Sequence, residues 1–415
     1  MALRFMHAAD LHLGSPFVGL GKVDGDVAEL VRNATEKAFD GLIDACIKNE
    51  IDFLLVAGDV YDSADRTLRA QLAFRNGLRR LSRAGIRAYV VHGNHDPLDG
   101  WSAALQWPPG VHIFHGEQPE AVPFDRGGTV EAVIHGVSFP RREVRTNLAR
   151  RFTRQDGDAF QIGLLHCNVG DNTGHAPYAS CTVDDLAGTG LDYWALGHVH
   201  TRKVIRSRNP AIVYPGNLQG RHINESGPRG CLLVEMDTAK QVRMEFLPID
   251  TIRWSRETVQ IKELDSDEAL LRALEHAIEG IRDREDGRTC ICRLILEGRG
   301  DLHRPLRRRG YIEDLREAAR RLGRQLDPLV WVDALEDRTR PPVDVKALRQ
   351  APDFLGDCLR LIDKYAGDAD HRTLLEQCLK PLHRYLQMPT DAELVSLLDE
   401  VETILIDDLL GEDKE

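Results

Sequence analysis

The sequence lacks the cysteine spacing and the apolar runs that mark several classes of protein. Its eight cysteines are scattered along 415 residues without a CxxC pair, which argues against a zinc knuckle or a disulfide framework. No segment comes near the ~18 consecutive apolar residues that a membrane helix needs, and the start, MALRFMHAAD, has no apolar signal-peptide core. We therefore expect a cytoplasmic protein with no membrane partner.

Basic residues are also in short supply. Lys and Arg number 54 against 66 Asp and Glu, for a net charge of -12, so the surface as a whole is not built to attract nucleic acid. Local sites remain open, because arginines cluster in RREVR (141–145), RKVIRSR (202–208) and HRPLRRR (303–309). Such runs are more often solvated faces than phosphate-binding sites. The charge pattern alone therefore does not indicate a DNA-binding surface.

The length and patterning of the chain predict three domains. In residues 1–254, short apolar strands that end in polar clusters alternate with helical stretches, which predicts an α/β domain. Residues 255–340 follow a strand, helix, strand, helix, strand pattern, which predicts a small α/β domain. Residues 341–415 begin with paired prolines and then look helical, ending in an amphipathic helix with a Thr390 and Glu393 capping box. That helix either folds back on its own domain or docks on a partner.

Polar side chains follow five of the apolar strands in the first domain. They are Asp10 and His12, Asp59, Asn94 and His95, His166, and His198 and His200. His198 and His200 are one residue apart, so on an extended segment both point to the same side, and Asp10 and His12 repeat this spacing. A chance pair on a loop is the alternative for either pair alone. All five strand ends together predict a metal centre.

Seven of these residues divide into two metal shells that share one carboxylate. The first shell would consist of Asp10, His12, Asp59 and His200, and the second of Asp59, Asn94, His166 and His198. Mixed imidazole and carboxylate ligation favours Mn²⁺, with Fe²⁺ or Zn²⁺ as alternatives and Mg²⁺ as a weaker one, because Mg²⁺ prefers oxygen ligands. Two such ions can clamp the phosphoryl oxygens of an in-line displacement, so the predicted reaction is phosphoester hydrolysis.

His95 is left over from the two shells. Next to Asn94, it could stabilise the phosphoryl oxygens or protonate the leaving alkoxide. Asp96 follows it directly and is expected to orient its ring. His95 and Asp96 are therefore the predicted catalytic residues.

Five short segments carry a family resemblance. They are DLH (10–12), GDVYD (58–62), GNHD (93–96), HCNVG (166–170) and GHVH (197–200). In this order, each after an apolar strand, they resemble the five signatures of the calcineurin-like metallophosphoesterases. The resemblance implies the α/β fold of that superfamily, a four-layer sandwich of two mixed sheets flanked by helices. Here it would be followed by the small α/β capping domain and the helical C-terminal tail.

Longer phrases are similar to one branch of this superfamily, the SbcD-like DNA repair exonucleases and in particular their YhaO-like members. The phrases are AADLHLGSPF, VHGNHDP, HAPYASCTVDDL (175–186) and VYPGNLQGRHINESGPRG (213–230). The likeness implies a Mn²⁺-dependent DNA exonuclease or endonuclease, often a homodimer, whose C-terminal helices dock on an SbcC-like, SMC-type coiled-coil ATPase. Some nuclease relatives have histidine at the position of Asp62, which bears on cleavage polarity and substrate form rather than on hydrolysis.

Other side chains are given packing or surface roles first. His7 and His92 precede the motifs and are expected to pack or to support the ligands from behind. Cys167 follows His166 on a strand and faces away from it, so we expect it in the core. Surface positions are expected for His112, His115 and His135. Loop positions near the strand ends make four more side chains candidates for substrate contact: His175, Tyr178, Asn217 and His222.

Three functions follow from these patterns. The first is a DNA repair nuclease, cytoplasmic and nucleoid-associated when it acts on DNA. The second is a phosphodiesterase or phosphatase for nucleotides or small phosphoesters, which the same metals would serve, although the capping domain favours a polymer. The third is a scaffold that couples an ATPase to DNA, which the acidic amphipathic tail supports.

Overall fold

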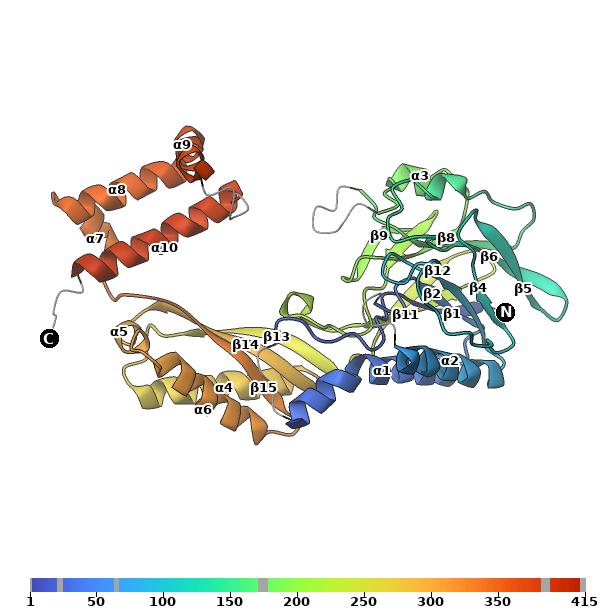
Figure 1. Ribbon diagram of the computed structural model, residues 1–415, viewed down its shortest axis with the longest axis horizontal. Helices are drawn as coiled ribbons and strands as arrows, with labels where there is room; N and C mark the ends of the chain where they lie inside the picture. The colour runs from blue at the N-terminus through green and yellow to red at the C-terminus, as the bar shows by residue number, and fades with distance from the viewer. Residues whose placement is uncertain (1, 21–24, 63–66, 171–177, 382–388, 411–415) are drawn as a thin grey trace. The chain divides into compact units, whose positions relative to one another are not determined.

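The computed structural model describes residues 2–20, 25–62, 67–170, 178–381 and 389–410 (Figure 1). Contacts divide the chain into two compact units. The first consists of residues 1–256, 281–292 and 326–333, and the second of residues 257–280, 293–325 and 334–415. The division into three domains stays a prediction.

The first unit contains two mixed six-stranded sheets. The first sheet has the order β12-β11-β1-β2-β3-β4, in which β1 to β4 are parallel and β11 and β12 run antiparallel to their neighbours. Its strands are β1 (Leu3–Ala8), β2 (Phe53–Ala57), β3 (Arg87–Val91), β4 (Val111–Ile113), β11 (Gly230–Met236) and β12 (Val242–Pro248). The central parallel strand β2, FLLVA, is wholly apolar and buried, because both faces of such a strand are covered.

The second sheet has the order β5-β6-β7-β8-β10-β9, with a parallel centre and an antiparallel strand at each edge. Its strands are β5 (Glu120–Arg126), β6 (Thr129–Val137), β7 (Phe160–His166), β8 (Tyr193–Gly197), β9 (Lys203–Ser207) and β10 (Ala211–Tyr214). Apolar side chains of both sheets, among them Phe5, Phe53 and Tyr193, fill the space between the sheets. This core brings two sets of parallel strands together face to face.

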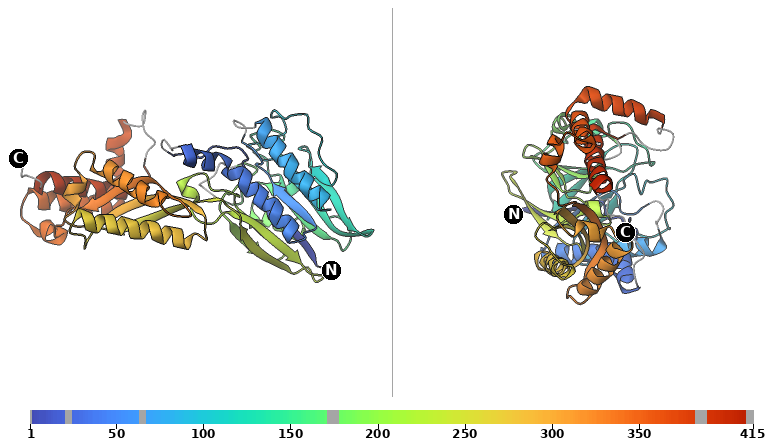
Figure 2. Two further views of the ribbon diagram at one scale, coloured as in Figure 1. Left: turned by 90° about the horizontal axis from the view of Figure 1, so that it is seen from below. Right: turned by 90° about the vertical axis from the view of Figure 1, so that its left-hand side faces the viewer.

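Helices cover the outer faces of both sheets. On the first sheet, α1 (Gly25–Lys48) and α2 (Leu68–Arg83) lie side by side and bury Phe39 and Phe74 against it (Figures 1 and 2). On the second sheet, the short helix α3 (Val183–Ala187) and the 3₁₀ turn Ala149–Arg151 pack over Trp194. The predicted four-layer sandwich of two mixed sheets flanked by helices is confirmed.

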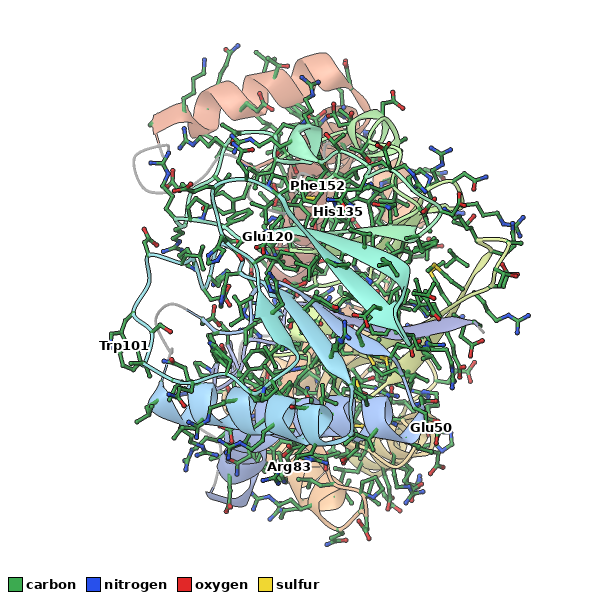
Figure 3. All side chains as sticks on the ribbon, turned by 90° about the vertical axis from the view of Figure 1, so that its right-hand side faces the viewer. Glu50, Arg83, Trp101, Glu120, His135 and Phe152 are labelled. Carbon is green, nitrogen blue, oxygen red and sulfur yellow. The ribbon has the colours of Figure 1, made fainter. Side chains whose placement is uncertain are left out.

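Two of the histidines expected on the surface lie elsewhere. His135 is on β6 and is buried, and its Nε2 lies 2.6 Å from Oε1 of Gln161 (Figure 3). His112 is on β4, half-buried, with Nε2 3.2 Å from Glu120. The prediction was wrong for these two because the segment forms strands, whose alternate side chains face inward. His115 is exposed, as expected.

A three-stranded sheet of order β13-β14-β15 follows the sandwich in sequence. Its strands are β13 (Ile252–Gln260), β14 (Thr289–Arg299) and β15 (Val330–Arg340), and the helices between them are α4 (Asp267–Arg284), α5 (His303–Leu306) and α6 (Tyr311–Arg324). The strand, helix, strand order matches the expectation. However, β13 begins three residues before the predicted boundary at 255, because the alternating pattern already starts at Ile252.

The end of the chain is helical. Its helices are α7 (Val345–Gln350), α8 (Phe354–Gly367), α9 (Ala369–Leu379) and α10 (Asp391–Leu410). Thr390 and Glu393 form the expected capping box, since each side chain meets the other residue's main-chain N–H. Leu394 and Ile406 of α10 are buried, Ile406 against α8 residues, whereas Val401 is 42% exposed. Within the described ranges, no helix has the length and apolarity to cross a bilayer.

Candidate metal centre

The predicted ligands stand where parallel strands end. Asp10 and His12 follow β1, Asp59 follows β2, Asn94 follows β3, His166 ends β7, and His198 follows β8. Carboxyl ends of parallel strands meet at one edge of a sheet, where open α/β folds bind their ligands. The two facing sheets therefore bring five loops to a single site.

The backbone is strained at this site. Asp10, His12 and Asp59 have φ values of 51°, 44° and 52°, and His198 has 103°. Residues with a Cβ rarely adopt such values, and each costs about 1–3 kcal/mol unless its surroundings hold it. The positive φ values break the up-and-down alternation of side chains that an extended strand would have, and the four side chains point toward the same site instead.

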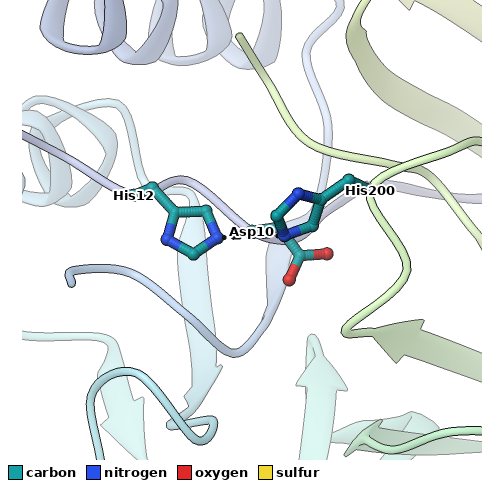
Figure 4. Close-up of side chains that lie close together, drawn as sticks. All are labelled: Asp10, His12 and His200. Atoms are coloured by element: carbon teal, nitrogen blue, oxygen red, sulfur yellow. Dashed lines mark hydrogen bonds between the residues drawn. The ribbon is translucent and has the colours of Figure 1, made fainter. Parts of the chain in front are cut away.

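Asp10, His12 and His200 form the first cluster (Figure 4). The Nε2 atoms of His12 and His200 face each other at 3.2 Å. The Asp10 carboxylate accepts the main-chain N–H of His198 at 3.1 Å to each oxygen. On the far side of its ring, His200 Nδ1 lies 2.6 Å from Glu225 Oε1. Because Glu225 holds Nδ1, the His200 ring presents Nε2 to the cluster.

His166 joins Asp10 and Asp59 in a second cluster. Nδ1 of His166 lies 2.9 Å from the Ala57 carbonyl, which can only accept, so Nδ1 carries the proton and Nε2 offers its lone pair. That Nε2 lies 3.0 Å from Asn94 Oδ1 and 3.4 Å from Asp59 Oδ2. The His198 ring stands edge-on to His166 with centroids 5.2 Å apart.

Asp59 lies between the two clusters. Its Oδ2 is 3.9 Å from His12 Nε2 as well as 3.4 Å from His166 Nε2, and its Oδ1 accepts the main-chain N–H of His95 at 2.9 Å. A Cβ at Gly93 would collide with the Asp59 carboxylate, so only glycine allows this approach. Asp59 is thus the candidate to bridge the two positions, and its bridging role stays a prediction.

The protonation states fit divalent cations. Burial raises the pKa of Asp10 to about 6, and burial followed by the charge of Arg221 lowers the pKa of His12 to about 4. Burial alone would lower the pKa of His166, but the Asp59 carboxylate raises it to about 9. His12 is therefore a neutral imidazole near pH 7, whereas His166 holds a second proton beside Asp59 that a bound cation would displace. The donor set suits two metal ions, and we treat all seven residues as candidate ligands.

The predicted partner of His95 is wrong. Asp96 accepts hydrogen bonds from the main-chain N–H groups of Val60 and Gly93 and lies 2.9 Å from His92 Nδ1. The carboxylate in contact with His95 Nδ1 is Asp62 instead. Sequence adjacency misled here, because Asp96 turns back to hold its own loop. The candidate orienting residue for His95 is therefore Asp62.

The comparisons with known proteins agree with this geometry. Residues 3–202 match the calcineurin-like phosphoesterase family, and residues 254–340 match the family described as metallophosphoesterase YhaO, middle domain. The chain is 36% identical over 365 residues to the uncharacterized metallophosphoesterase YhaO of Bacillus subtilis, with 87% of each chain covered. The chain belongs to the calcineurin-like metallophosphoesterases.

More distant relatives of this metallophosphoesterase cover less of it. It is 28% identical to the DNA double-strand break repair protein Mre11 of Sulfurisphaera tokodaii, over 51% of this chain and 52% of Mre11. It is also 28% identical to a subunit of the nuclease SbcCD of Escherichia coli K12, over 49% of this chain and 57% of that protein. The chain thus spans about half the length of these two relatives.

Other side chains of the metallophosphoesterase pack in the core or lie beside the candidate ligands. His7 and His92 are buried, and His7 lies 3.0 Å from the Tyr193 hydroxyl. Cys167 is buried with its sulfur 3.8 Å from that of Cys181, which confirms core packing. Tyr178 lies near the site, with its ring centroid 6.1 Å from that of His198.

Two further candidates for substrate contact serve the fold. Asn217 is buried and donates to the Gln219 carbonyl, and the His222 ring caps a short turn by accepting from Asn224 N–H. His175 lies outside the described residues.

The sequence prediction missed Glu225 and Arg229. Glu225 is mostly buried and contacts His200 through Oε1 and the main-chain N–H of Arg221 through Oε2, at 2.6 and 2.7 Å. The buried Arg229 donates to the carbonyls of His200 and Glu225. The only signal was the phrase QGRHINESGPRG, which contains both residues. The sequence of this phrase does not reveal which of its side chains reaches His200.

Glu225→Gln is expected to weaken metal binding on the His200 side by about 10–100-fold, the usual cost of losing the group that orients a metal-bound histidine. Gln keeps the size of the side chain but loses the charge that fixes Nδ1–H. Mn²⁺ titration of the metal-free protein measures the effect, with Glu117→Gln on an exposed loop as the control. If Glu225→Gln bound Mn²⁺ with unchanged affinity in both metal positions, the role of Glu225 would be contradicted.

Proposed function

We propose that this metallophosphoesterase is a Mn²⁺-dependent DNA nuclease, exonuclease or endonuclease, that acts in DNA repair. The observation that carries the proposal is the pair of donor clusters with Asp59 between them. Its Oδ2 lies 3.9 Å from His12 Nε2 on one side and 3.4 Å from His166 Nε2 on the other. Two bound ions would supply an activated hydroxide and neutralise the charge on the phosphoryl oxygens. Manganese is the first choice because nitrogen and oxygen donors are mixed.

The residues of the chain have separate tasks in this hydrolysis. Glu225 and the Ala57 carbonyl fix the ring orientations of His200 and His166 before any substrate arrives. His95 is 38% exposed by its side chain, whereas the candidate ligand side chains His12 and Asp59 are 1% exposed. His95 is therefore the histidine placed to meet substrate, and we assign it the proton that the leaving oxygen needs.

DNA is the proposed substrate because the chain is similar to Mre11 over 51% of its length and to the SbcCD subunit over 49%. The two proteins are named for double-strand break repair and for a nuclease. The acidic net charge makes a local DNA site necessary rather than a generally basic surface.

The test is hydrolysis of DNA compared with hydrolysis of a small ester. With Mn²⁺, the purified chain is expected to shorten or nick labelled single-stranded or linear double-stranded DNA and also to hydrolyse bis(p-nitrophenyl) phosphate. Removal of the metal by a chelator should abolish both activities. Hydrolysis of the small ester without any cleavage of DNA would overturn the DNA assignment in favour of a small-molecule phosphodiesterase.

The proposed partners are a second copy of the chain, in a homodimer, and an SbcC-like, SMC-type coiled-coil ATPase. Apolar side chains stand exposed in both units. In the first unit these include Leu68, Leu98 and Trp101, of which Trp101 is 61% exposed (Figure 3). In the second unit Phe354 of α8 and Ile404 of α10 are 70% and 50% exposed. Sedimentation of the chain alone and with such an ATPase measures both associations.

A further inference from the structure

Asp62 is in contact with four polar side chains at once. Its Oδ1 contacts Nδ1 of His95 and lies 3.4 Å from Nδ1 of His12. Its Oδ2 accepts a hydrogen bond from the Ser15 hydroxyl and one from Nη1 of Arg221 at 2.8 Å. One oxygen thus faces the imidazoles while the other is held from behind.

Arg221 is itself held in place. Its main-chain N–H donates to Glu225 Oε2 at 2.7 Å, and its carbonyl accepts from Val18 N–H at 3.0 Å. Its side chain is only 13% exposed. A guanidinium fixed at its base and mostly shielded from water can hold a carboxylate in one rotamer, since a charge-assisted hydrogen bond is among the stronger ones.

The Asp62 contact decides which His95 nitrogen is available. Because the carboxylate only accepts, Nδ1 must donate to it, and Nε2 is the nitrogen on the opposite side of the ring. Moving Asp62 would therefore turn the ring and take Nε2 away from this direction.

We infer that Arg221 is a positioning residue that acts through Asp62 to aim Nε2–H of His95 at the leaving oxygen. The inference rests on the proposed function in one respect, the proton donation by His95. In that step the attacking hydroxide forms a new P–O bond and the P–O bond to the leaving group breaks. The electron pair of the broken bond goes to the leaving oxygen, and the Nε2 proton passes to that oxygen, which leaves neutral imidazole on the enzyme.

The test uses two small diesters that differ in their need for a proton. Thymidylyl-(3′→5′)-thymidine releases an alkoxide, which needs protonation, whereas bis(p-nitrophenyl) phosphate releases a stable nitrophenolate. Arg221→Gln is expected to lower kcat for the dinucleotide by about 10–100-fold, part of the full effect of a general acid. For the nitrophenyl ester, kcat should change by less than about threefold on the same grounds. Arg221→Lys, which keeps the charge, should recover part of the loss.

Two further variants keep the result interpretable. Arg256→Gln removes another arginine bound to the same segment, through Asn224, and should leave both rates unchanged. In the double variant His95→Ala with Arg221→Gln, the loss should equal that of His95→Ala alone, since residues that act through one another are not additive. Equal losses on both esters, or additive losses in the double variant, would overturn the role of Arg221.

Failure of the proposed function would look different. If the wild-type chain hydrolyses the dinucleotide but no DNA, the DNA assignment fails. The ratio of the two ester rates in Arg221→Gln would still test the positioning role of Arg221. If DNA is cleaved and the ratio does not change in Arg221→Gln, the positioning role alone fails.

Discussion

Asp59→Asn is expected to remove both metal ions and to lower the rate of phosphodiester hydrolysis by about a thousandfold or more, because metal ions supply several kcal/mol of transition-state stabilisation. Asp59 is the carboxylate within 3.9 Å of His12 Nε2 and 3.4 Å of His166 Nε2, one nitrogen from each candidate position. Asparagine keeps the shape but loses the charge, and a neutral amide cannot balance two divalent cations. The reduction in rate should therefore accompany the loss of metal.

Metal content measured by mass spectrometry on the purified variants checks this expectation. Asp59→Asn should retain close to no Mn²⁺, whereas His200→Ala and His198→Ala should each retain about one ion per chain, since each histidine is assigned to one position. Asp44→Asn, on the exposed side of α1, is the control and should bind two. An Asp59→Asn variant that still binds two ions would show that Asp59 does not bridge them.

The clustering of the candidate ligands could be predicted because its signal is local. Each stands directly after an apolar strand, and strands that are parallel in one sheet end at the same edge, so a list of strand ends is already a list of neighbours. His198 and His200 illustrate this point. Their spacing suggests that both point to one side, and the structure places His200 beside His12 and His198 beside His166.

The supporting residues could not be predicted in the same way, because their contacts join distant parts of the chain. Arg221 and Asp62 are 159 positions apart, and Glu225 and His200 are 25 apart. No periodicity connects such pairs. Asp96 shows the opposite error, since it lies next to His95 in sequence yet turns back to Val60 and Gly93.

The strained backbone was equally hidden from the sequence. Aspartate and histidine tolerate a positive φ better than most residues, but their composition does not reveal that Asp10, His12, Asp59 and His198 all adopt it. Contacts between separate loops help to hold this state, among them the hydrogen bonds from Asp10 N–H to the Gly58 carbonyl and from His12 N–H to the Asp59 carbonyl. The strain therefore belongs to the assembled site, which is also why loss of a single ligand is expected to disturb its neighbours.

His95→Ala is expected to lower kcat on DNA by about 10²–10⁴-fold, the range of a general acid, while both metal ions stay bound. The two effects separate because the His95 side chain is not one of the seven candidate ligands, although its ring meets that of His12 edge-on with centroids 5.1 Å apart. Its Nδ1 contacts Asp62, and only its main-chain N–H, which alanine keeps, donates to Asp59. Asp59 would therefore keep its position in the variant.

The leaving group again provides the deciding comparison. With bis(p-nitrophenyl) phosphate, which releases a stable nitrophenolate, His95→Ala should lose much less activity than with DNA, which releases an alkoxide. His115→Ala, an exposed histidine outside the candidate clusters, is the matched control and should behave as wild type. If the loss were equally large on both substrates with full metal content, His95 would be stabilising the phosphoryl oxygens rather than donating the proton, because that charge develops whichever group leaves.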